Sequence, residues 1–243
     1  MERKRSWNVT DKRFVVFLDI MGFKDFVARH THDEVYEMMS RISLVKESID
    51  ELSARYTTST YKDKLYTTSF SDSIILFSED DSARSLEMIV SATSFLFSTA
   101  MGQSIPMKGA IAHGLMSVNK TQQIYVGQPL IDAYLLQEEV NYYGVVAHNS
   151  IDAYLNKRAH EMESSFREVF FEEKVPLKTG KILHNNINWF SVLSIMNDEE
   201  LRKSSFKEIL IEMKSITSGT PRKYIDNTEE VFNLLYNKEE PKN

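Results

Sequence analysis

Cysteine is absent from this sequence of 243 residues, which excludes disulfide bonds, thiolate zinc sites and a cysteine nucleophile. Glycine and proline are scarce, with 8 and 5 residues, so we expect long regular elements and few flexible linkers. No apolar run approaches the length of a membrane span, and the charged residues 2–5 are not followed by the apolar segment of a signal peptide. We therefore expect a cytoplasmic protein without a membrane segment.

Basic residues are also too few for a positively charged surface, because the net charge is −6. Broad nucleic-acid binding needs a basic face, so we expect no nucleic-acid partner. A divalent ion can still bring a small anionic substrate to an acidic protein. The sequence lacks a glycine-rich P-loop, a G-x-G-x-x-G fingerprint and a G-x-S-x-G elbow, which weakens kinase, dinucleotide-binding and hydrolase interpretations.

Two aspartates each stand at the end of a strand-like run. Asp19 follows the apolar residues 14–18, and Asp72 follows residues 66–71 and precedes the apolar residues 74–77. Such runs predict buried strands, where a bare carboxylate is costly unless a cation meets it. Two carboxylates on neighbouring strands would offer hard oxygen ligands to Mg²⁺ or Mn²⁺, and a pair of such ions can clamp a phosphoryl transfer. The alternative is that Asp19 caps a helix and Asp72 lies in a hairpin turn.

The spacing of apolar residues predicts alternating strands and helices over the first 150 residues. The expected strands are 13–19, 64–71, 73–78, 107–113, 123–126 and 143–148, and the expected helices are 33–55, 82–101 and 129–140. This β-α-β-β-α-β order, with hairpin-linked middle strands, predicts an α+β fold with a ferredoxin-like core. The length fits one domain with an appendage, which we place at residues 12–150 and 151–243.

Beyond residue 150 the pattern is weaker. We expect a helix at 150–162, extra strands and a loop around 169–171 and 185–190, and helices at 198–216 and 228–236. An aromatic tract such as the one around Phe170 and Trp189 more often forms core or dimer contacts than a base-stacking platform. This part of the chain is expected to form a helical and stranded extension packed on the core.

Small residues alternate in the stretch 108–114, which permits close approach of a backbone or a ligand. Lys108 could meet phosphate or a base edge there as a point charge, or it could extend into solvent. Gly127 and Pro129 open the helix that follows, and backbone N–H groups at such a start attract phosphate, although many ordinary helices begin this way.

Histidine and aspartate also cluster at His30, His32 and Asp33. No H-E-x-x-H motif or matching partner cluster accompanies them, so we interpret them as a loop at the start of a helix.

Four stretches together resemble class III nucleotidyl cyclases. Residues 17–23 resemble the first-metal motif of that family, residues 70–73 fall where its second metal aspartate lies, and residues 108–114 and 125–134 are similar to its later strand and helix. The resemblance covers about residues 12–150 and is closer to the pyrimidine cyclases of bacterial Pycsar anti-phage systems, which make cyclic UMP or cyclic CMP. It does not account for residues 151–243.

This resemblance implies a catalytic domain at 12–150 that acts as a homodimer with active sites at the subunit interface. It implies two divalent ions, Mn²⁺ or Mg²⁺, bound by Asp19 and Asp72 with the backbone carbonyl of Ile20 as a further ligand. The expected reaction converts UTP into 3′,5′-cyclic UMP and pyrophosphate, as a second messenger in anti-phage defence. CTP is the alternative substrate, and UTP is favoured because cyclic UMP is the commoner product among the relatives that the chain resembles.

The same resemblance assigns substrate contacts. We expect Phe17, Gly22 and Phe23 to lie beside the triphosphate, and Tyr66, Thr68 and Phe70 to lie near the base, with Lys108 as a further substrate contact.

Three positions depart from the purine cyclases. Ile131 and Leu135 occupy the places of an Asn and an Arg that serve the transition state, and Thr68 replaces the adenine-selecting lysine. An ordinary adenylate cyclase is therefore not expected. Loss of the Asn/Arg pair favours a non-catalytic nucleotide-binding or dimerisation module as the alternative. A palm-type polymerase or diguanylate cyclase shares the two-aspartate arrangement, but the sequence has no Gly-Gly-Asp/Glu-Glu-Phe segment.

Overall fold

The computed structural model describes residues 7–55, 65–158, 169–190 and 199–237. The strands are β1 (Thr10–Ile20), β2 (Leu65–Phe70), β3 (Ser73–Ser78), β4 (Met107–Asn119), β5 (Ile124–Gly127), β6 (Val145–Ala147), β7 (Phe170–Leu177) and β8 (Gly180–Ile187). The helices are α1 (Phe23–Arg29), α2 (His32–Arg55), α3 (Ala83–Gly102), α4 (Gln128–Glu139), α5 (Asn149–Arg158), α6 (Glu199–Ile216) and α7 (Thr220–Asn237).

One mixed sheet runs through the described part of the chain in the order β2-β3-β1-β4-β6-β8-β7, with β5 paired to the outer part of β4. The strands β2, β3, β1 and β4 pair antiparallel. This is the strand order of a ferredoxin-like core, so the predicted α+β fold and βαββαβ plan are confirmed. The short strand β6 runs parallel to β4 and joins β8 and β7 to the same sheet.

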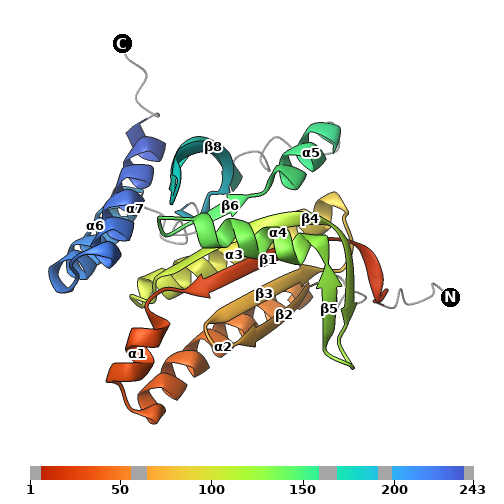
Figure 1. Ribbon diagram of the computed structural model, residues 1–243, viewed down its shortest axis with the longest axis horizontal. Helices are drawn as coiled ribbons and strands as arrows, with labels where there is room; N and C mark the ends of the chain where they lie inside the picture. Colours follow the sequence, from red (N-terminus) through yellow and green to blue (C-terminus); the bar gives the residue numbers. More distant parts are fainter. Residues whose placement is uncertain (1–6, 56–64, 159–168, 191–198, 238–243) are drawn as a thin grey trace.

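The sheet is covered differently on its two faces (Figure 1). Helices α2 and α3 lie behind it, and α4 crosses in front of β1 and β4. Side chains of β1 alternate accordingly, because successive strand residues point to opposite faces. Leu18 and Ile20 enter the main core with α3, whereas Phe17 packs with Ala112 and with Ala133 of α4. Much of the β2–β3 hairpin is left uncovered in front (Figure 1).

Two helices differ from the sequence prediction. The short helix α1 was not predicted, because a helix of seven residues carries too few apolar repeats to show a period. Helix α7 begins at Thr220 and not at residue 228. Pro221 fits the first turn of a helix, because the N–H that proline lacks would have no partner there. The sequence prediction did not use this start signal.

Strands β4 and β7 are longer than predicted, whereas β6 covers only the middle of the predicted strand 143–148. β4 runs to Asn119, where the sequence suggested an end at 113, and β7 continues to Leu177. Trp189 is fully buried and stacks on Phe190, which confirms the core interpretation of the aromatic tract. The predicted ends at residues 64, 159–162 and 198 lie outside the described residues.

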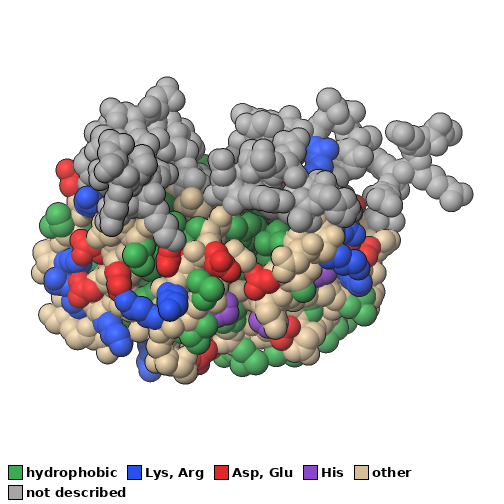
Figure 2. Space-filling model, turned by 90° about the horizontal axis from the view of Figure 1, so that it is seen from above, with side chains coloured by type: hydrophobic (Ala, Val, Ile, Leu, Met, Phe, Trp, Pro, Cys, Tyr) green, Lys and Arg blue, Asp and Glu red, His purple; other side chains and the backbone are tan. Residues whose placement is uncertain are grey.

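Acidic and basic side chains are interspersed on the face shown in Figure 2, so no single sign of charge dominates that view. Among the described helices, none combines the length and apolar character that a membrane crossing requires.

Candidate active site

Asp19 lies in a row of side chains that crosses four strands. It is the register partner of Ser73 on β3 and of Lys108 on β4, and Phe70 on β2 is the partner of Ser73. Directly opposed residues of antiparallel strands point to the same face. Phe70, Ser73, Asp19 and Lys108 therefore share one face at the end of β1.

Two further rows lie behind this one on the same face, which is the face that α4 partly covers. The second row contains Thr68 and Phe17, and the third contains Tyr66. By strand rise, Tyr66 lies about 13 Å along the strand from the row of Asp19. The register thus places the predicted residues Phe17, Thr68, Phe70 and Lys108 within two rows and leaves Tyr66 further away.

The backbone brings the second aspartate to the first. Asp72 lies in the β2–β3 turn, after Ser71 with a positive φ of 55°, and its carbonyl accepts a hydrogen bond of 2.9 Å from the Ile20 N–H. The expected hairpin turn is confirmed. The proposed helix cap is wrong for Asp19, because the N-cap of α1 is Gly22, with φ 76°, and no side chain caps that helix.

The pKa of Asp19 is raised, because its surroundings disfavour the ionised carboxylate. Burial raises its pKa to about 6, the neighbouring Asp72 carboxylate raises it as well, and the Lys108 ammonium opposes this shift. Like charges brought together in a partly buried place disfavour ionisation. A divalent cation would reverse that cost at this point.

The side chains at this place have the ligand atoms that a divalent cation binds. Asp19 and Asp72 supply carboxylate oxygens, the ligands that Mg²⁺ and Mn²⁺ prefer. Within the described residues no group of three or more His, Asp or Glu side chains forms a complete metal cage. Ions bound by few protein carboxylates complete their coordination with water and substrate phosphates, as Mg²⁺ does in nucleotide enzymes. The carbonyl of Ile20 as a ligand stays a prediction.

Lys108 is buried, so the alternative that it extends into solvent is wrong; only 4% of its surface is exposed. Its Nζ donates to the carbonyls of Glu138 at 3.3 Å and Val140 at 3.5 Å. These carbonyls lie at the C-terminal end of α4, where the helix dipole attracts cations. Burial lowers the pKa of Lys108, while the Glu138 and Asp19 carboxylates raise it. Its role toward substrate stays a prediction.

The remaining predicted contacts have distinct surroundings. Phe70 is 84% exposed beside the turn that carries Asp72, so its ring is accessible. Gly22 precedes α1, and Phe23 packs partly buried against the main core. The Tyr66 hydroxyl is paired with that of Tyr125 at 2.7 Å, and burial raises the pKa of Tyr66 to about 12. This engaged hydroxyl weakens the expectation that Tyr66 contacts the base.

The glycine at position 109 allows the backbones of two strands, β4 and β1, to approach each other closely. A Cβ there would come within 2.6 Å of the Phe17 carbonyl and 2.4 Å of the Leu18 side chain, so glycine lets β4 lie against β1. The histidine cluster has no part in this site, since His30 ends α1 and His32 and Asp33 open α2.

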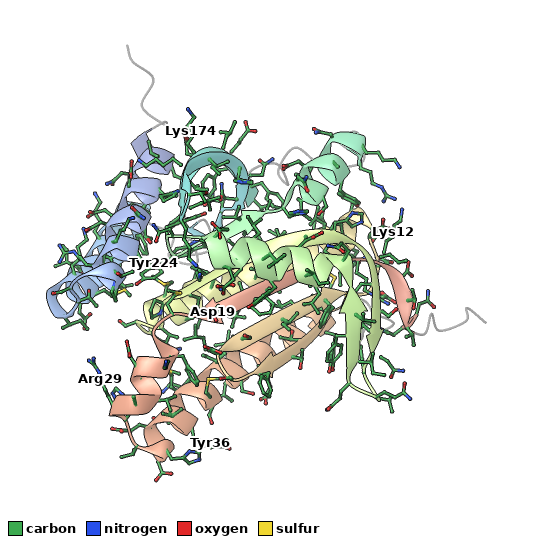
Figure 3. The ribbon with its side chains drawn as sticks, viewed as in Figure 1. Lys12, Asp19, Arg29, Tyr36, Lys174 and Tyr224 are labelled. Carbon is green, nitrogen blue, oxygen red and sulfur yellow. The ribbon has the colours of Figure 1, made fainter. Side chains whose placement is uncertain are left out.

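Sequence reasoning missed two groups that face the row of Asp19. Glu138 of α4 and Tyr224 of α7 both interact with Lys108, and Tyr224 also lies close enough to Asp19 for that carboxylate to raise its pKa. Figure 3 shows Asp19 and Tyr224 at the same end of the sheet. The start signal at Pro221 would have placed Tyr224 on a helix, but no local pattern ties α7 to β1.

The outer face of α4 is apolar at the two positions, Ile131 and Leu135, for which the sequence resemblance predicts loss of an Asn and an Arg. Ile131 is 51% exposed and Leu135 is 57% exposed. Other apolar side chains of α4, β4 and β5 are also exposed, namely Leu115, Ile124, Val126 and Tyr134. Ile131 and Leu135 lie one helical turn apart on α4, and adjacent exposed apolar side chains are typical of a protein contact surface.

Comparison with known proteins places the fold. No protein-family model and no curated protein matches the sequence. Among solved structures, the chain is similar to the guanylate cyclase domain of RhGC from Catenaria anguillulae in complex with GTP, with a TM-score of 0.53 and 12% identity over 73% of this chain and 96% of that one.

Two more solved structures agree. The catalytic core of a rhodopsin-guanylyl cyclase with converted specificity, in complex with ATPαS, gives a TM-score of 0.52 at 14% identity, over 73% and 94% of the two chains. A dimeric guanylyl cyclase domain of the RhoGC fusion protein from Blastocladiella emersonii gives 0.50 at 11%, over 72% and 93%. The chain therefore has the fold of nucleotide cyclase domains.

Proposed function

We propose that this protein is a nucleotide cyclase that converts UTP into 3′,5′-cyclic UMP and pyrophosphate. The observation that carries the proposal is the pair of carboxylates at the end of β1 and in the β2–β3 turn. Asp19 and Asp72 are held together by the hydrogen bond from the Ile20 N–H to the Asp72 carbonyl, and their repulsion contributes to the raised pKa of Asp19. A scaffold gains nothing from two such costly groups.

In the proposed reaction the ribose 3′-oxygen attacks the α-phosphorus. The 3′-hydroxyl loses its proton, a bond forms between that oxygen and the α-phosphorus, and the bond to the β-phosphate oxygen breaks to release pyrophosphate. Asp19 and Asp72 would hold two divalent ions, Mn²⁺ or Mg²⁺, which supply charge neutralisation to the phosphates. Lys108 offsets the negative charge of Asp19 from the neighbouring strand.

Base recognition is proposed for the uncovered part of the same face. Thr68 and the exposed Phe70 ring lie on β2 beside the row of Asp19. An aromatic ring offers a stacking surface, and Thr68 leaves no cation for a purine edge. UTP is preferred over CTP on the sequence resemblance, which is also the basis for a second-messenger role in anti-phage defence.

A homodimer is part of the proposal. The exposed apolar residues of α4, β4 and β5 would be covered by a second copy, since a closed two-fold pair buries the same patch on both subunits. The division into a catalytic domain at 12–150 and an extension at 151–243 is likewise proposed.

The test is to incubate the purified protein with Mn²⁺ or Mg²⁺ and equal amounts of UTP, CTP, ATP and GTP, and to identify products by mass spectrometry. Cyclic UMP is expected to dominate. Dominant cyclic CMP would overturn only the choice of UTP, and dominant cyclic AMP or cyclic GMP would overturn the pyrimidine assignment.

A non-catalytic nucleotide-binding or dimerisation module is the second candidate, and one observation favours it. Ile131 and Leu135 present only hydrocarbon at the places where purine cyclases have transition-state groups. Nucleotide binding measured by calorimetry, together with no cyclic product from any of the four triphosphates, would support this candidate and contradict the enzyme.

A further inference from the structure

The C-terminal end of α4 and the residues that lead from it to β6 (138–144) supply the carbonyls that hold Lys108, and the C-terminal extension (residues 151–243) holds this segment from two sides. On one side, the β7–β8 hairpin contacts it through the backbone. The Lys178 N–H donates to the Glu139 carbonyl at 2.8 Å, and the Asn141 N–H donates to the Pro176 carbonyl at 3.1 Å. A bridge between Val140 and Leu177 completes this contact.

On the other side, α7 contacts the same segment through side chains. The Asn227 amide donates to the Asn141 carbonyl at 2.6 Å. The Tyr143 N–H donates to the Thr228 hydroxyl at 2.8 Å, and both groups are buried. Buried hydrogen bonds are costly to lose because the freed group has no water to replace its partner. Helix α7 is therefore fixed relative to the end of α4.

This placement brings Tyr224 to Lys108. Tyr224 is 6% exposed, and the Lys108 Nζ lies 6.0 Å from the centroid of its ring. Its ring also stacks on Tyr143 at a centroid distance of 6.0 Å. A cation at this distance from an aromatic face is attracted by the ring, most strongly when both are desolvated.

Lys108 depends on such support. Its two carbonyl partners lie at 3.3 and 3.5 Å, which is long for a hydrogen bond from an ammonium. The side chain is nevertheless buried. The Tyr224 ring adds an attractive contact to these two long hydrogen bonds, on the strand next to Asp19.

We propose that Tyr224 is a positioning residue of the candidate active site, and that through it the C-terminal extension completes the surroundings of Lys108 beside Asp19. This inference rests on the proposed cyclase activity for its kinetic consequence, but the contact itself can be tested without it.

The first measurement is the acetylation rate of individual lysines in the full-length protein, followed by mass spectrometry. In the wild type, Lys108 should react far more slowly than the exposed Lys12 and Lys174, which Figure 3 labels. Tyr224→Leu keeps an apolar side chain but removes the aromatic ring, and should raise the Lys108 rate about tenfold by opening its surroundings. Tyr224→Phe keeps the ring and should retain slow acetylation.

Two further variants separate the loss of a local contact from a general loss of folding. Lys223→Ala changes the exposed neighbour on α7 and should leave the Lys108 rate unchanged. Thr228→Val removes the hydroxyl that accepts a hydrogen bond from the Tyr143 N–H, and so loosens α7 against the segment that follows α4. It should raise the acetylation rate of Lys108, and it provides the test if Tyr224→Leu does not fold. An unchanged Lys108 rate in a folded Tyr224→Leu or Thr228→Val variant would overturn the proposal, whether or not the protein cyclises any nucleotide.

The second measurement is steady-state kinetics with UTP and Mn²⁺. Tyr224→Leu should lower kcat about tenfold or more with little change in KM, because a displaced charge next to the reacting phosphate acts on the transition state. Tyr224→Phe should restore kcat. Equal kcat in the wild type and a folded Tyr224→Leu variant would contradict the positioning role, whereas an inactive wild type would contradict only the proposed function.

Discussion

Asp19 and Lys108 lie directly opposite each other on the antiparallel strands β1 and β4. Each stabilises the charged form of the other, since Lys108 lowers the pKa of Asp19 and Asp19 raises that of Lys108. Neither effect overcomes burial, which is the largest influence on both groups. The charged forms of both groups are thus disfavoured by burial, and a further cation beside Asp19 would relieve that cost.

Replacing either aspartate should abolish cyclisation. Asp19→Asn and Asp72→Asn each remove one carboxylate from the proposed ion site but keep the shape of the side chain, so the fold should be retained. We expect turnover to fall by at least about a hundredfold, measured as cyclic product by mass spectrometry. Near-normal turnover of either folded variant with Mn²⁺ present would rule out the two-ion assignment.

Asp19→Asn should also raise stability above about pH 6. The pKa of Asp19 is raised from 3.8 to about 6 in the folded state, so the folded protein binds more protons than the unfolded chain between these values. Its stability therefore falls as pH rises through that window and stays lower above it. The variant avoids this loss of stability, which the shift in pKa puts at about 3 kcal/mol and which screening by solvent at this partly exposed group reduces to about 2 kcal/mol.

Thermal melting at pH 4 and pH 8 measures this effect. The gap between wild type and Asp19→Asn should be larger at pH 8, and Mn²⁺ should stabilise only the wild type. An equal gap at both pH values would show that Asp19 is not perturbed.

Phe70→Ala should weaken substrate binding without harming the fold. The ring is 84% exposed, so its removal should change the melting temperature by no more than about 2 °C. If the ring stacks on the base, KM for UTP should rise several-fold. Tyr36→Ala is the matched control, because Tyr36 is another exposed aromatic residue, 69% exposed on α2, and its loss should leave both KM and the melting temperature unchanged. An unchanged KM would remove Phe70 from the site.

Leu135→Glu should separate the proposed dimer. A charge at this 57% exposed position of α4 would have to be desolvated when the second copy binds. Light scattering should give a dimer mass for the wild type and a monomer mass for the variant, which should also lose cyclase activity. Ile211→Glu, on a 63% exposed position of α6, should remain a dimer. A monomeric wild type that still cyclises would refute the assembly.

Gln137→Met should stabilise the protein. Gln137 lies on the buried face of α4, and neither polar atom of its amide has a hydrogen-bond partner within the described residues. Methionine has nearly the same shape and leaves no buried polar group unsatisfied, so we expect a gain of about 1 kcal/mol. Chemical denaturation measures the change, and a loss of stability would indicate that the amide has a partner, such as a buried water.

The core of the fold was predictable because its signals are local. The apolar runs that end at Asp19 and flank Asp72 mark strands by their composition, and the tight turn between β2 and β3 follows from their spacing. The ferredoxin-like order then places these strand ends side by side. The pairing of Asp19 with Lys108 could not be predicted, since register depends on tertiary contacts such as the close approach at Gly109.

The contacts of Lys108 could not be predicted from the sequence either, for a different reason. Its partners are backbone carbonyls of Glu138 and Val140, and a carbonyl carries no residue-specific signal. Tyr224 reaches it only because α7 docks on the segment between α4 and β6. A lysine at the end of a strand is most often exposed, and that general rule failed where a helix end and an aromatic ring offered a buried alternative.

The docking of α7 on the segment between α4 and β6 has a consequence for the order of synthesis. Asp19 leaves the ribosome long before Tyr224 and the groups that fix it, because about 200 residues separate them in the chain. Domains begin to fold during synthesis, so the ferredoxin-like strands can pair before α7 has emerged from the exit tunnel. Until α7 emerges, Lys108 lacks its aromatic partner. A nascent or prematurely terminated chain would then present two aspartates without the surroundings that a finished chain provides.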